Sequence, residues 1–183
     1  LGRRVVLPWM QSASSADDFN AITVYGANIL NRSLEWALAV NECSFMQKRS
    51  FLPDGTPLAS GTQVGVGTEV KFLIYINNKG SALSDISIQD ILDPAFSYVP
   101  GTLQIDNTVS ECANNTCTAA EEAAIFAAID DNAYLTDSAN GDRARYDSGS
   151  TTIDAGAGNV PGNGIVNVNA NSVWALLFSV TLN

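Results

Sequence analysis

The chain has 183 residues, of which 46% are hydrophobic and only 15% are charged, whereas about 25% charged residues is typical. It has 19 acidic residues, 9 basic residues and no histidine, which gives a net charge of −10. This charge argues against nucleic-acid binding, and the missing histidine excludes the commonest general base and most zinc sites. The low charged fraction indicates that other molecules cover part of the surface.

Residues 1–50 are expected to form an N-terminal extension. It contains two apolar segments, Ala21–Leu30 and Leu34–Val40. The first is typical of a strand, whereas the second fits either a strand or a short helix. The residues that favour a strand in the first segment are Ile22, Val24 and Tyr25. Since the chain has no run of 18 apolar residues, we expect no membrane span.

Residues 51–183 are expected to form one all-β sandwich domain. After a turn signal at Pro53–Pro57, short β-rich runs alternate with Gly, Asn, Asp and Pro. The expected strands are Glu69–Asn77, Asp85–Gln89, Phe96–Val99, Thr102–Ile105, Gly164–Val168 and Val173–Leu182. Short strands at this spacing are typical of a β-sandwich. Residues 137–164, rich in Asp, Asn and Gly, are expected to be surface loops.

One helix is expected to interrupt the strands. Thr118 and Glu121 have the spacing of a capping box, and the run Ala119–Ile129 that begins there is rich in Ala and Glu. The sequence therefore predicts a short helical insertion in the sandwich.

The cysteines and two sequence triplets point to an extracellular protein. A disulfide between Cys112 and Cys117 would close a short loop and imply an oxidising compartment, with Cys43 left free or paired to another chain. The alternative is three buried thiols. Asn31 and Asn114 each begin an N-glycosylation triplet, and Asn114 is the better candidate because it lies between the two cysteines.

The stretch Val70–Ile105 has a recognisable order: a strand, an Asn-Asn-Lys-Gly turn, a second strand, Asp-Ile-Leu-Asp-Pro, and then Phe-Ser-Tyr-Val-Pro-Gly-Thr. This order resembles the conserved repeat domain of bacterial and archaeal surface proteins, with Asp93 inserted before the proline. The resemblance implies an immunoglobulin-like sandwich that serves as an extracellular spacer or coat module. It carries no catalytic residues.

Two of the expected strands are apolar on both faces. Beside the core-facing set of Glu69–Asn77, the opposite face carries Leu73 and Tyr75; in Val173–Leu182 it carries Val173 and Leu177. A sandwich usually leaves one face of each sheet to water, so something is expected to cover these four residues. One interpretation is that the N-terminal 50 residues fold back within the chain. The other is that they add to a neighbouring copy, as in donor-strand pilins, which makes the four residues and Ile22, Val24 and Tyr25 a subunit interface.

No catalytic group stands out. The carboxylate pairs Asp90–Asp93 and Asp130–Asp131 fall at turns or a helix end, where Asp caps backbone amides. We therefore expect no enzyme and no cofactor. Calcium is the alternative, because several acidic-loop residues offer oxygen ligands, although their spacing matches no calcium-loop motif. These residues are Asp137, Asn140, Asp142, Asp147 and Asp154.

These observations predict a secreted cell-surface protein. We expect a structural subunit of a pilus-like filament or coat, a homopolymer that assembles through its N-terminal segment. The alternative is a monomeric adhesin or glycan-binding module.

Overall fold

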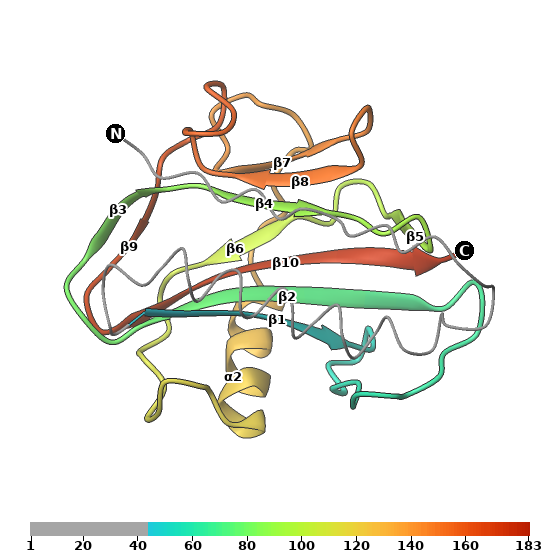
Figure 1. The fold of residues 1–183 in the computed structure, drawn as a ribbon, viewed down its shortest axis with the longest axis horizontal. Helices are drawn as coiled ribbons and strands as arrows, with labels where there is room; N and C mark the ends of the chain where they lie inside the picture. The colour runs from blue at the N-terminus through green and yellow to red at the C-terminus, as the bar shows by residue number, and fades with distance from the viewer. Residues whose placement is uncertain (1–43) are drawn as a thin grey trace, which may run out of the picture.

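The computed structural model describes residues 44–183, which form two facing β layers and one helix (Figure 1). The main sheet contains β1 (Ser44–Phe51), β2 (Glu69–Asn78), β5 (Phe96–Tyr98), β6 (Gln104–Asp106) and β10 (Ser172–Leu182). Strand β2 lies between β1 and β10, while β5 and β6 both pair with β10 on its other side. All pairs are antiparallel. Strand β1 therefore forms one edge of this sheet.

The facing layer consists of two smaller antiparallel sheets. One has the order β4 (Ile88–Ile91), β8 (Thr152–Ala155), β7 (Ala144–Asp147), and the other pairs β3 (Leu83–Ile86) with β9 (Val166–Val168). The backbone that links β3 to β4 passes so close to Gly156 that only glycine fits there. Gly156 has φ +89°, and a Cβ there would lie 2.1 Å from the Ile86 carbonyl oxygen.

The main core lies between the two layers and follows the alternation expected from the sequence. Strands β2 and β10 contribute every second residue to it. These residues are Val70, Ile74, Ile76, Trp174, Leu176, Phe178 and Val180. From the facing layer come Ile88, Ile153, Ala155 and Val166. Phe72, on the same face of β2, is partly buried and packs against this core.

A third layer is formed by α2 (Ala119–Asp130), which lies on the other side of the main sheet (Figure 1). The predicted all-β sandwich with one short helical insertion is confirmed for the described residues. Within residues 44–183, no helix is long and apolar enough to cross a membrane.

Two expectations about chain organisation are corrected. Residues 44–50, assigned to the N-terminal extension, belong to β1 and pair with β2 along their whole length. The sandwich therefore begins before residue 51. In addition, the predicted loop region 137–164 contains the hairpin of β7 and β8. Its strands have only four residues each, too few for an alternation of polar and apolar residues to show.

Candidate functional site

The sheet face that the sequence predicted as a subunit interface is covered by the chain's own helix. Leu73, Tyr75, Val173 and Leu177 lie on this face, and none of them is more than 1% exposed. Together with the other buried residues of this face and of α2, they form a second core, separate from the one between the two sheets. The helix residues in it are Ile125, Phe126 and Ile129. The interface prediction for these four residues is therefore wrong, because the helical insertion packs onto the face within the same chain.

Polar side chains tie this helix to the two strands beneath it. Arg49 Nε on β1 and the Tyr75 hydroxyl on β2 both donate to Glu122 Oε1 of α2, each at 2.7 Å. Burial raises the pKa of the Tyr75 phenol well above its usual range, and the hydrogen bond to Glu122 raises it further. Lys71 forms an ion pair with Asp130 at the end of the helix. The charged side chains on this face thus connect the helix to the main sheet.

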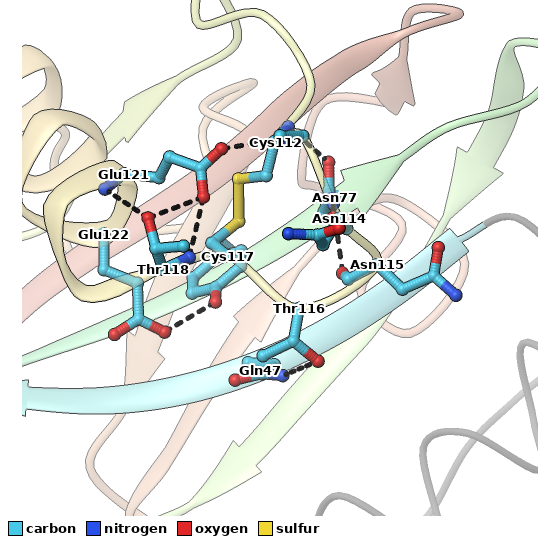
Figure 2. Close-up of a disulfide and its surroundings, with 12 residues drawn as sticks. Gln47, Asn77, Cys112, Asn114, Asn115, Thr116, Cys117, Thr118, Glu121 and Glu122 are labelled. Carbon is cyan, nitrogen blue, oxygen red and sulfur yellow. Dashed lines mark hydrogen bonds between the residues drawn. A yellow bond between two sulfur atoms is a disulfide. The ribbon is translucent and has the colours of Figure 1, made fainter.

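A disulfide joins Cys112 and Cys117 and closes the loop that leads into α2 (Figure 2). Asn77, which is fully buried on β2, holds this loop from below. Its Nδ2 donates to the carbonyl oxygens of Asn114 and Asn115 at 2.9 and 3.0 Å, and its Oδ1 accepts from the Cys112 N–H at 3.0 Å. The loop is therefore fixed both by a covalent bond and by hydrogen bonds to the main sheet.

The start of the helix is bound to the same loop. Glu121 Oε2 accepts from the Thr118 N–H and Oε1 accepts from the Ala113 N–H, each at 2.7 Å, while the Thr118 hydroxyl accepts from the Glu121 N–H. The N–H groups of Ala113 and then Thr118 lower the pKa of Glu121. The predicted capping box is confirmed.

Of the two predicted glycosylation sites, only Asn114 falls in the described residues. It is exposed within the disulfide-closed loop. Asn31 lies outside residues 44–183, as do Cys43 and the proposed donor-strand residues Ile22, Val24 and Tyr25. A glycan at Asn114 stays a prediction.

The residues suggested as calcium ligands do not converge. Asp137 accepts from the Tyr98 hydroxyl at 2.5 Å, Asp142 from the Thr136 N–H and hydroxyl, and Asp147 from the Gly149 N–H. The Gly149 N–H is also the main reason why the pKa of Asp147 is lowered. Asp154 accepts from Gln89, and Asn140 is exposed in the same loop region as Asp142. In residues 44–183, no three Asp, Glu or Cys side chains are grouped to hold a metal ion.

The two carboxylate pairs are also separated by their contacts. Asp93 caps the Ala95 N–H, as expected for a turn. Asp90 instead lies between the sheets, 2.5 Å from Lys48 Nζ, and Asp130 pairs with Lys71. The capping interpretation is therefore wrong for Asp90 and Asp130, because each is placed beside a lysine of the main sheet.

Strand β1 is the feature that sequence reasoning missed, and its outer side forms an edge of the main sheet that is largely unpaired among residues 44–183. Only the C-terminal end of this edge is paired, through a short β-bridge to residues 56–58. There the Ser50 carbonyl accepts from the Leu58 N–H at 2.9 Å, and the Leu52 N–H donates to the Thr56 carbonyl at 2.8 Å. Because backbone groups alternate in direction along an antiparallel strand, Ser44, Met46 and Lys48 also point their N–H and C=O groups away from β2. No strand within residues 44–183 pairs with these groups. We call them the β1 edge.

Comparison with known proteins gives little further information. No protein-family model and no curated protein matches the chain. Among solved structures, the full-length major pilin RrgB from Streptococcus pneumoniae is similar at a TM-score of 0.32 and 15% identity, over 75% of this chain and 20% of that chain. The pilus backbone RrgB from Streptococcus pneumoniae is similar at 0.29 and 14%, over 75% and 27%. The chain thus spans about a quarter or less of their length, and likeness at these values carries no argument about function.

Proposed function

We propose that the chain is a structural subunit of an extracellular, pilus-like filament or surface coat, and that it assembles by β-strand complementation through its N-terminal segment. The observation that carries this proposal is the β1 edge. At the end of β1 that follows residue 43, this edge has no partner strand among residues 44–183, and residues 1–43 include a segment whose composition favours a strand.

An open sheet edge is a template for pairing with another chain. A strand from a neighbour would satisfy the outward N–H and C=O groups of the β1 edge, and main-chain hydrogen bonds would provide the affinity. Each copy then offers one donor segment and one acceptor edge. A head-to-tail contact of this kind that does not close on itself extends into a fibre.

The rest of the described domain suits a load-bearing module. The helix-covered face is closed by α2, the loop before α2 is cross-linked, and the buried charges of the main sheet are engaged in ion pairs. The disulfide supports an oxidising, extracytoplasmic location.

The proposal can be tested by blocking the β1 edge with proline. Proline at position 46 removes the outward N–H without removing a bond to β2, and proline is tolerated on sheet edges. In sedimentation velocity, we expect the wild-type chain to form large particles and Met46→Pro to remain at the mass of one 19.3 kDa chain. Met46→Ala is the matched control, because it also removes the buried side chain but keeps the N–H.

We expect Met46→Ala to assemble like the wild type. If Met46→Pro assembles as well as Met46→Ala, the β1 edge is not the acceptor. If the wild-type chain itself remains a single copy, the filament proposal is wrong, and the alternative of a monomeric adhesin or glycan-binding module takes its place.

A further inference from the structure

The side chains of β1 present two different surfaces to any strand that adds to its edge. Met46 is opposite Ile76 and belongs to the core between the two sheets. Gln47 is opposite Tyr75 and therefore lies on the helix-covered side. An added strand would thus have Met46 and Lys48 beside it on the core side, and Gln47 and Phe51 on the helix-covered side.

On that second face, the side-chain oxygen of Gln47 lacks a hydrogen-bond partner among the described residues. Only 9% of the residue is exposed, and its Nε2 donates to Thr116 Oγ1 at a long 3.4 Å. Its Oε1 is buried and has no hydrogen-bond partner among the described residues. Buried side-chain acceptors are nearly always paired with a protein group or a water molecule, so a donor on an added strand would satisfy this oxygen.

The segment Ala21–Leu30 matches this pair of surfaces. In a strand, Ile22 and Val24 would point to one side and Thr23 and Tyr25, both with hydroxyl donors, to the other. Residues 1–10 also contain apolar residues, but Pro8 argues against an uninterrupted central strand there.

We propose that Ala21–Leu30 is the strand that occupies the β1 edge, with Ile22 and Val24 facing the core beside Met46 and with Thr23 and Tyr25 facing Gln47. That this strand comes from a neighbouring copy rests on the proposed function. The orientation itself does not depend on that origin. The 13 residues from Asn31 to Cys43 span up to roughly 45 Å, enough to reach either the same domain or the next one.

Cysteine cross-linking of the full-length chain tests the orientation. In a Cys43→Ser background, Met46→Cys is combined in turn with Ile22→Cys, Thr23→Cys, Val24→Cys or Tyr25→Cys. After mild oxidation, disulfides are mapped by mass spectrometry and the products are run on non-reducing gels. We expect cross-linking to Met46→Cys to be at least about tenfold stronger from positions 22 and 24 than from 23 and 25, because side chains alternate along a strand.

A second series with Gln47→Cys in place of Met46→Cys is expected to invert this pattern. If Met46→Cys prevents folding, this second series is sufficient to test the orientation, since position 47 lies outside the main core. Cross-links without alternation, or none at all in folded chains, would overturn the inference.

The same gels separate this inference from the proposed function. Alternating cross-links in a ladder of multiples support both. Alternating cross-links confined to a single chain support the orientation and refute assembly through a neighbour. Absent cross-links in chains that still form large particles refute the orientation and leave assembly by another contact.

Discussion

Truncation of Leu177 tests whether α2 covers this face of the main sheet within a single chain. The residue is 1% exposed beneath α2. Leu177→Ala should therefore lower the free energy of unfolding of a single chain by about 2–5 kcal/mol, the usual cost of truncating a buried leucine. Chemical denaturation under conditions in which the chain is a single copy provides the measurement.

Val66→Ala is the matched control, because Val66 is 79% exposed and such surface changes usually stay within about 0.5 kcal/mol. A Leu177→Ala variant as stable as the Val66→Ala variant would mean that α2 does not cover this face in solution.

Tyr75 should make the stability depend on pH at the alkaline end. Its pKa is raised in the folded chain, first by burial and then by its hydrogen bond to Glu122. In the unfolded chain the phenol ionises at about pH 10. Its contribution is therefore complete below that pH and is lost as the pH rises above it.

We expect the free energy of unfolding to fall between pH 9 and pH 11, and to fall less steeply in Tyr75→Phe. Tyr134→Phe serves as control, because Tyr134 is 61% exposed. Equal slopes in the wild type and Tyr75→Phe would show that the Tyr75 phenol is not sequestered.

At the level of elements, α2 depends on its first turn. Thr118→Ala removes the hydroxyl that accepts from the Glu121 N–H and should lower the free energy of unfolding by about 1 kcal/mol. Thr118→Ser keeps the hydroxyl and should remain close to the wild type. The comparison is made by thermal or chemical denaturation. A Thr118→Ala variant indistinguishable from Thr118→Ser would mean that the disulfide-closed loop alone holds the helix start.

Elements with a clear local pattern could be predicted from the sequence. The long strands Glu69–Asn77 and Val173–Leu182 are within one residue of β2 and β10, and the helix expected over Ala119–Ile129 is one residue short of α2. The capping residues and the alternation of apolar side chains are local signals, so they can be recognised without knowledge of the tertiary fold.

Strand β1 could not be found in this way. Its middle reads Gln47, Lys48, Arg49, which is not typical of a half-buried strand. These side chains are accommodated because Lys48 and Arg49 meet Asp90 and Glu122, residues more than 40 positions away in the sequence. The partners become visible only when the layers are assembled.

For the whole molecule, the sequence correctly indicated that the main sheet is covered on both faces. It did not indicate which element covers the second face. The apolar residues on the second face of β2 and β10 carry no information about their partner. The covering element is the helical insertion α2, and not the N-terminal residues of the same chain or of a neighbouring copy. The β1 edge, through which we propose assembly, is defined by backbone groups and therefore has no signature in side-chain composition.

Negative-stain electron microscopy of the purified, unboiled full-length chain shows directly whether copies join through the β1 edge into fibres. We expect regular thin fibres from the wild type and from Met46→Ala, and isolated small particles from Met46→Pro. Uniform small particles from the wild type, or fibres from Met46→Pro, would rule out assembly through the β1 edge.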